Sequence, residues 1–273
     1  MTTTSQSDID ASNAEFWSEL CGSSLARAIG VNDASAESLA RFDRAYLDLY
    51  PYLERYLPWR SGERVLEVGL GYGTVGGLLV GRGLDYHGLD IAPGPVAMME
   101  HRVRLLGGTG SAAQGSALDI PHSDSSFDVV VSIGCLHHTG SLAGAIDEVH
   151  RVLRPGGEAM LMVYNARSYR RLMTLPAKAL VSGDWRDPVR RRELVRGAYD
   201  ANEAGDAAPV TEFVDAGELR MMLGRFRDVT VRKENCDPIV LGWRRLRRAI
   251  PREWLLGNLG RVLGLDLYVA ARK

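Results

Sequence analysis

The sequence is poor in several features that mark whole classes of protein. Only three cysteines occur in 273 residues, Cys21, Cys135 and Cys236, and none forms a CxxC pair, so neither a zinc site nor a disulfide framework is predicted. No run of about 18 apolar residues is present, and the amino-terminal MTTTSQSDID lacks the basic and apolar segments of a leader. We therefore expect a cytosolic protein without a metal site or an integral membrane segment.

An excess of one charge sign is also missing. The chain has 33 basic and 34 acidic side chains, a formal net charge of -1, so no overall positive field indicates a nucleic-acid-binding protein. Its composition, 45% hydrophobic and 25% charged, is typical of a globular domain, and its length allows one large core with an appended cap. These values leave the oligomeric state undetermined.

Short apolar runs alternate with helical stretches through the middle of the chain. The runs that predict strands are 64–68, 84–89, 109–115, 127–133 and 158–164, followed after a break by 226–233 and 265–271. The stretches that predict helices are 75–82, 95–106, 142–153 and 215–223. This alternation predicts an α/β fold with a doubly wound, Rossmann-like parallel sheet.

The segments outside this rhythm suggest five parts. We expect a disordered tail over 1–12, a helical lid over 13–60, a core over 61–166, an inserted substrate cap over 167–212, and a return to the core sheet over 213–273. Within the cap, 167–196 carries nine Lys/Arg against three Asp/Glu. These arginines, Arg167 among them, either hold a carboxylate or phosphate or form a solvated helix face.

Two other features outside the core have two interpretations each. The aromatic residues Trp17, Tyr46 and Tyr50 lie on predicted helices and either cover a pocket or belong to the core. A second basic stretch, 243–252, mixes arginine with tryptophan and either contacts a membrane surface or lipidic substrate or is a solvated helix face.

A glycine-rich turn follows the first predicted strand in VLEVGLGYGT, residues 65–74. Glycines at 69, 71 and 73 let backbone N–H groups approach a ligand beside a helix N-terminus. The same region satisfies the GxGxxG spacing of dinucleotide-binding enzymes through Gly71, Gly73 and Gly76, so the turn alone does not identify the ligand.

Two carboxylates narrow the choice of ligand. Glu67 lies two residues before the first glycine, where it would repel a pyrophosphate and favour a sulfonium and its amino group. Asp90 ends the second strand, 21 residues after Gly69, at the position of an acid that accepts ribose hydroxyls. The alternatives are that Glu67 caps a loop and that Asp90 caps the next helix.

Four segments in a fixed order carry a family resemblance: VLEVGLGYGT, GLDIAP, GSALDIPHSDSSFDVVVSIGCLHHT and EVHRVLRPGGE. Together they resemble a class I S-adenosylmethionine-dependent methyltransferase, and more narrowly the group with the quinone-biosynthesis and small-molecule enzymes. The resemblance spans about 64–164. It implies a seven-stranded mixed sheet with an N-terminal lid and inserted cap, S-adenosylmethionine as cofactor, S-adenosylhomocysteine as product, and a small-molecule acceptor with an O, N or C nucleophile. A peptide acceptor is a second possibility.

The resemblance also assigns residues to the cofactor. It implies that the glycines line the methionine part, that Asp90 holds the ribose, and that Ile91 packs on adenine. Ser116 stands where the family usually has an acid for the adenine amino group, so this chain departs from the pattern there. The residues assigned in this way are Glu67, Gly69, Gly71, Gly73, Asp90, Ile91, Ser116, Ala117, Leu118 and Ser132.

Adjacent histidines follow the fourth strand at the edge where such sheets bind ligands. His137 and His138 are candidates for a base that removes a proton from a hydroxyl or amine, with His138 preferred, and the alternative is that they shape the loop. Two other functions remain open: an NAD-dependent oxidoreductase, motivated by the glycine spacing, and a nucleoside-binding regulator without catalysis.

Overall fold

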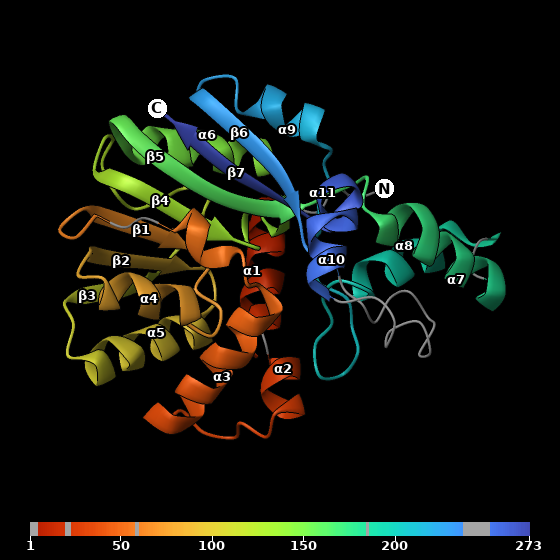
Figure 1. Cartoon of the computed structure of the whole chain (residues 1–273), viewed down its shortest axis with the longest axis horizontal. Helices are drawn as coiled ribbons and strands as arrows, with labels where there is room; N and C mark the ends of the chain where they lie inside the picture. The colour runs from red at the N-terminus through yellow and green to blue at the C-terminus, as the bar shows by residue number, and fades with distance from the viewer. Residues whose placement is uncertain (1–4, 20–22, 58–59, 184–185, 237–251) are drawn as a thin grey trace.

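A single sheet organises the chain in the computed structural model, which describes residues 5–19, 23–57, 60–183, 186–236 and 252–273. The sheet has seven strands in the order β3-β2-β1-β4-β5-β7-β6 (Figure 1). β7 runs antiparallel to both of its neighbours, β5 and β6, and the other described strand pairs are parallel. The strands are β1 (Arg64–Val68), β2 (Asp85–Asp90), β3 (Gly110–Gln114), β4 (Phe127–Ile133), β5 (Leu153–Tyr164), β6 (Arg227–Glu234) and β7 (Asp266–Arg272). The predicted Rossmann-like, seven-stranded mixed sheet is confirmed.

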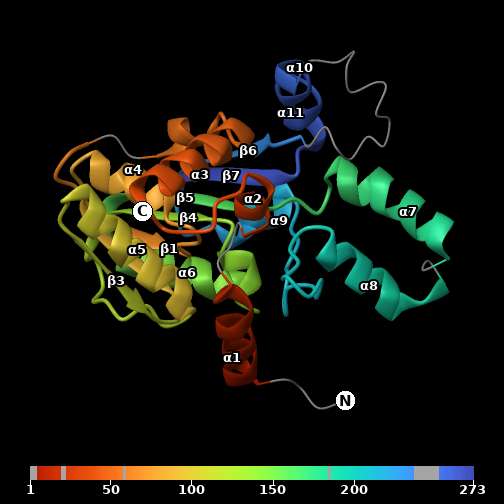
Figure 2. The same ribbon diagram turned by 90° about the horizontal axis from the view of Figure 1, so that it is seen from below.

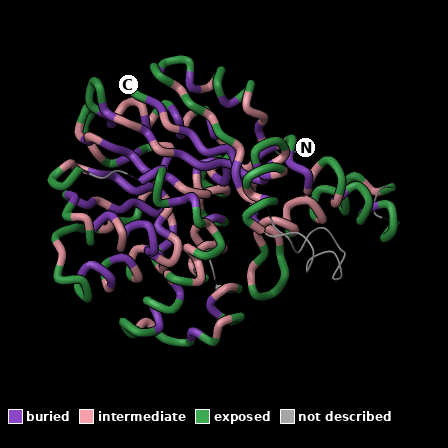
Figure 3. Tube along the Cα trace, viewed as in Figure 1, coloured by how far each residue is buried: buried purple, intermediate pink, exposed green. Residues whose placement is uncertain are grey.

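Helices cover both faces of this sheet (Figure 2). One face packs against α4 (Thr74–Gly81), α5 (Pro93–Leu106) and the 3₁₀ turn Leu53–Tyr56. The other packs against α6 (Leu142–Val152) and α9 (Ala216–Met222). Because both faces are covered, the central strands read as continuous apolar runs, as in FDVVVSI of β4. Figure 3 shows the buried residues following the strands.

The amino-terminal segment differs from the prediction. Residues 6–12, expected in a tail, belong to helix α1 (Gln6–Trp17), which begins with a capping box between Ser5 and Asp8. The Gln6 side chain donates to the Thr139 carbonyl, so α1 is anchored to the loop that follows β4 (Figure 1). The segment has almost no apolar periodicity because capping and hydrogen bonds, rather than an apolar face, fix it.

The lid region continues with α2 (Ser23–Ala28) and α3 (Ala36–Leu49). After β5, residues 167–212 leave the sheet, and α7 (Leu175–Ser182) and α8 (Pro188–Gly197) project from the body in both views (Figures 1 and 2). A π-helical turn, Arg170–Thr174, precedes α7. The chain then returns to the sheet, where the Glu212 N–H donates to the His137 carbonyl.

Two short helices, α10 (Arg252–Gly257) and α11 (Leu259–Leu263), precede β7. The basic stretch predicted over 243–252 lies outside the described residues except for Arg252. Within the described part of the chain, no helix is both long and apolar enough to cross a membrane.

Candidate active site

A cavity of about 360 Å³ lies at the carboxyl ends of β1, β2 and β4, and α1 and α3 also line it. The register explains why these ends meet, since Val68 pairs with Leu89 and Glu67 pairs with both Gly88 and Val131. Open parallel sheets bind ligands at this edge, and the volume falls within the range of small-molecule sites, ~300–1,000 Å³.

The glycine-rich loop turns sharply between β1 and α4. Gly69, Gly71 and Gly73 have φ of +86°, +49° and +78°, a region that side chains disfavour. Gly69 and Gly71 line the cavity, whereas Gly73 does not. A Cβ on Gly73 would lie 2.6 Å from the Arg102 Cδ, so this glycine is needed for close packing against α5.

Asp90 fixes this loop to the end of β2. Its Oδ2 accepts the Leu70 N–H at 2.7 Å, and its Oδ1 accepts the Ala92 N–H at 2.9 Å. It does not cap α5, because Ala92 is the N-cap and makes no side-chain bond. Burial raises the pKa of Asp90, while the backbone N–H groups oppose that shift. The carboxylate is therefore held in one orientation at the cavity wall.

Glu67 lies deeper, beneath the N-terminus of α4. Its side chain accepts a hydrogen bond of 2.5 Å from the Tyr86 hydroxyl, and the Gly76 N–H also points to it. The residue is 2% exposed, and burial raises the pKa of its carboxyl to about 8. Although it lines the cavity, Glu67 is also part of the packing between α4 and the sheet.

The cavity brings together most of the residues singled out from the sequence. The predicted residues that line it are Glu67, Gly69, Gly71, Asp90, Ile91, Ser116, Ala117, Trp17, Tyr46, Tyr50 and His138. Those that do not line it are Gly73, Leu118, Ser132, His137 and Arg167. Both interpretations of the aromatic residues hold for Tyr46 and Tyr50, which line the cavity and pack against the core.

Three of the outlying residues have clear structural partners. Ser132 and Ile133 are adjacent on β4, so their side chains point to opposite faces of the sheet. Ile133 lines the cavity, whereas Ser132 is fully buried and donates to the Val68 carbonyl. Leu118 packs against the core cluster under α6. Arg167 has a 71% exposed side chain and pairs with Asp215 at 2.7 Å.

The two histidines have different surroundings because they occupy one 3₁₀ turn, Leu136–His138. His137 is fully buried outside the cavity wall, and burial lowers its pKa well below the usual value. His138 lines the cavity, and its Nδ1 lies 2.7 Å from the Val210 carbonyl. A carbonyl only accepts, so Nδ1 carries the proton and Nε2 offers a lone pair when the ring is neutral.

Asp200 and Asn13 are site residues that the sequence did not reveal. The Asp200 Oδ2 lies 3.6 Å from the His138 Nε2, and its Oδ1 accepts from the Tyr164 hydroxyl at 3.1 Å. Asn13 donates its amide to the His138 carbonyl. Each is remote in sequence from His138 and belongs to no motif; the acidic composition of 199–218 gave the only local signal for Asp200.

The charges along the cavity wall fit a cationic cofactor. Its described lining residues include four acidic side chains and no lysine or arginine; the acids are Asp10, Glu67, Asp90 and Asp200, of which Glu67 keeps its proton up to a pH of about 8. A sulfonium and an ammonium group would be favoured there, whereas the two phosphates of a dinucleotide would find no cationic partner. The donor set therefore fits S-adenosylmethionine and disfavours NAD.

Comparison with known proteins identifies the domain. Residues 66–161 match the methyltransferase domain family. A probable phthiotriol/phenolphthiotriol dimycocerosates methyltransferase of Mycobacterium ulcerans is 36% identical over 128 residues, which cover 46% of this chain and 48% of the relative. A demethylmenaquinone methyltransferase of Tropheryma whipplei is 30% identical over 162 residues, covering 56% of this chain and 65% of the relative. The chain thus spans about half the length of the mycobacterial relative.

Solved structures share the fold at low sequence identity. A Thermotoga maritima protein described as an S-adenosylmethionine-dependent methyltransferase, possible histamine N-methyltransferase, has a TM-score of 0.53 and 15% identity, covering 84% of this chain and 89% of its own. A Haemonchus contortus phosphoethanolamine N-methyltransferase in complex with S-adenosylmethionine gives 0.54 and 17%, covering 84% and 52%. The sequence motifs, the sheet and the matched family agree: this chain carries a class I S-adenosylmethionine-dependent methyltransferase domain.

Proposed function

We propose that this chain transfers the methyl group of S-adenosylmethionine to a small-molecule acceptor. The observation that carries the proposal is the glycine loop, which Asp90 fixes to the end of β2 at the wall of an acidic cavity. The matched methyltransferase domain and the curated relatives support it. A peptide acceptor is the variant of this function that the cavity favours less, because α1 and α3 help to enclose it.

Particular residues have proposed roles toward the cofactor. Asp90 would accept the ribose hydroxyls with the lone pairs that the Leu70 and Ala92 N–H groups leave free. Ile91 would pack on the adenine, with Ser116 and Ala117 at its edge. Gly69 and Gly71 would let the backbone approach the methionine part, and Glu67, whose carboxyl keeps its proton up to a pH of about 8, would lie beneath it.

The protein's contribution to the reaction would be mainly positioning. The bound cofactor supplies a methyl group already activated by its sulfonium, so alignment and exclusion of water account for much of the rate. His138 is the proposed proton acceptor, since the residue lines the cavity and its Nε2 carries a lone pair in the neutral ring. His137 has no such role in this proposal, because it does not line the cavity.

Calorimetry tests the cofactor assignment directly. The wild-type protein should bind S-adenosylhomocysteine and S-adenosylmethionine but not NAD, and Asp90→Ala should weaken S-adenosylhomocysteine binding about 100-fold because it removes both the ribose contact and the support of the glycine loop. Asp147→Asn is the matched control, since this carboxylate is 60% exposed and pairs with Arg225 at the surface. Binding of NAD without S-adenosylhomocysteine would overturn the proposal.

A further inference from the structure

Three residues that line the cavity, one of them His138, carry a hydrogen-bond acceptor that has no donor among the described residues. The Asn13 Oδ1, His138 Nε2 and Asp200 Oδ2 are buried, and none has a hydrogen-bond partner among the described residues. The side chain of His138 is 5% exposed, and Asn13 as a residue is 5% exposed. All three residues line the cavity. Such atoms are costly to bury unless a ligand pairs with them.

The chemical character of these three atoms is fixed by the bonds that the same side chains make elsewhere. Asn13 uses its amide nitrogen on the His138 carbonyl, so its oxygen faces away from that bond. His138 uses its Nδ1–H on the Val210 carbonyl, which leaves Nε2 as an acceptor in the neutral ring. Asp200 receives the Tyr164 hydroxyl on Oδ1 and leaves Oδ2 unpaired. A ligand group rich in N–H bonds matches this set.

Charge and aromatic rings point the same way. Two arginines of the inserted segment are engaged with other groups: Arg170 donates to the Ala198 carbonyl and lies 4.6 Å from the Tyr199 ring centroid, and the Arg171 guanidinium lies 4.0 Å from the Phe213 ring centroid. Neither lines the cavity. The residues that line it beside His138 include Trp17 and Tyr164, and aromatic faces attract cations.

We propose that the methyl acceptor is an amine, bound as its ammonium ion between Asn13, His138 and Asp200. This proposal rests on the proposed function and specifies its nucleophile. An anionic acceptor, such as a carboxylate or phosphate, would find no cationic side chain among the described lining residues. The same absence argues against the arginines of 167–196 as an anion site in this cavity.

The reaction balances with the groups present. The ammonium nitrogen gives one proton to the His138 Nε2, and the Asp200 carboxylate, 3.6 Å away, stabilises the resulting imidazolium. The nitrogen's lone pair then forms a bond to the methyl carbon as the carbon–sulfur bond breaks, and that electron pair stays on sulfur. The product is a methylated ammonium ion, and His138 returns the proton to solvent.

A matched set of probes tests this assignment by binding alone. Calorimetry on protein saturated with S-adenosylhomocysteine would compare 2-phenylethylamine, 2-phenylethanol and 3-phenylpropanoate. We expect the amine to bind at least 10-fold more tightly than the alcohol and the carboxylate to bind least. Asp200→Asn should weaken amine binding at least 10-fold and alcohol binding less than 2-fold, whereas Asp147→Asn should change neither. Asp147 is a surface carboxylate remote from the cavity wall.

A second variant keeps the test independent of Asp200. Trp17→Leu should weaken amine binding about 3- to 10-fold, with a smaller effect on the alcohol, because it removes an aromatic face from a partly exposed helix. An amine that binds no better than its alcohol, or variants that lower both affinities equally, would overturn the amine assignment. Failure of S-adenosylhomocysteine to bind the wild-type protein would instead count against the proposed function.

Discussion

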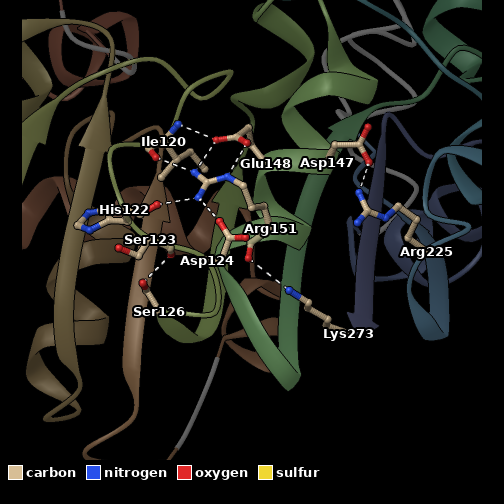
Figure 4. A network of polar contacts seen from close by, with 10 residues as sticks. All are labelled: Ile120, His122, Ser123, Asp124, Ser126, Asp147, Glu148, Arg151, Arg225 and Lys273. Carbon is tan, nitrogen blue, oxygen red and sulfur yellow. Dashed lines mark hydrogen bonds and ion pairs between the residues drawn. The ribbon is translucent and has the colours of Figure 1, made fainter.

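Two polar clusters built from similar residue types contrast sharply in this protein. Around Arg151, near the amino end of β4, all five guanidinium N–H groups have acceptors at 2.7–2.9 Å: Glu148, Asp124 and the carbonyls of Ile120 and His122 (Figure 4). At the opposite edge of the sheet, Asn13, His138 and Asp200 each keep an acceptor without a donor in the part of the chain that the structure describes. The hydrogen bonds of the first cluster are complete within the protein, whereas the second has unpaired acceptors for which we propose a ligand.

The contrast separates stabilising polar groups from binding groups. A saturated cluster contributes to the free energy of unfolding, while unpaired buried acceptors lower it and gain their partners only on binding. Lys273 extends the saturated cluster by donating to the Arg151 and Leu153 carbonyls, which ties the end of β7 to α6 and β5. Substitutions in the two clusters should therefore change stability in opposite directions.

The largest expected effect on stability concerns Glu67. This residue accepts a hydrogen bond from Tyr86, as the members of the saturated cluster do from their donors, but it is deeply buried. Its pKa is raised to about 8, so the folded state keeps a proton that the unfolded chain releases near 4.5. Stability is therefore lost as the pH rises between these values, by roughly 5 kcal/mol at ~1.4 kcal/mol per pH unit. Glu67→Gln should remove this slope, as measured by urea unfolding from about pH 5 to pH 8. Parallel curves for both proteins would contradict the interpretation.

Breaking the saturated cluster should come next. Arg151→Ala removes five hydrogen bonds and leaves the Glu148 carboxylate with the Ile120 N–H, so it should lower the free energy of unfolding by about 2 kcal/mol at neutral pH. Arg151 holds the pKa of Glu148 below its usual 4.5, so this stabilisation is present above that value and is lost as the pH falls. The difference from wild type should shrink in acid, while S-adenosylhomocysteine binding persists. Arg225→Ala, which removes one exposed ion pair, is the control.

The incomplete cluster should respond with the opposite sign. Burial raises the pKa of Asp200 above its usual 3.8, so its carboxylate destabilises the unliganded fold increasingly as the pH rises above that value. Asp200→Asn should therefore raise the free energy of unfolding by about 1 kcal/mol at neutral pH and have no effect near pH 3. Thermal or urea unfolding without ligand measures this change. A loss of stability comparable to that of Arg151→Ala would remove the contrast between the clusters.

The smallest effect is expected at Arg167. Its pair with Asp215 is largely exposed on the arginine side, so Arg167→Ala should change the free energy of unfolding by less than about 0.5 kcal/mol. Binding of S-adenosylhomocysteine and of 2-phenylethylamine should be unchanged, because Arg167 does not line the cavity. A 10-fold loss of either affinity would show that the inserted segment approaches the ligand by another route.

Most of the sheet and its glycine loop were predictable because their signals are local. The strands over 64–68 and 127–133 have the predicted bounds, since an apolar run in a covered parallel sheet needs no distant partner to be recognised. The position of Asp90 was equally predictable from the sequence, because an acid at the end of the strand that follows the glycine turn has a fixed place in this type of sheet. Helix α1 was missed because its stabilising contacts, a cap and bonds to a remote loop, leave no apolar periodicity.

The sequence by itself determined the fold class and the family, through runs and motifs whose physical meaning depends on near neighbours in the chain. Only the tertiary structure decided which histidine faces the cavity, because a single 3₁₀ turn directs His137 and His138 to different surroundings. It also brought Asn13 to His138 across 125 positions of sequence, and Asp200 to the same ring from the inserted segment. Such contacts arise from chain packing, which no local pattern records, and the proposed choice of acceptor rests on them.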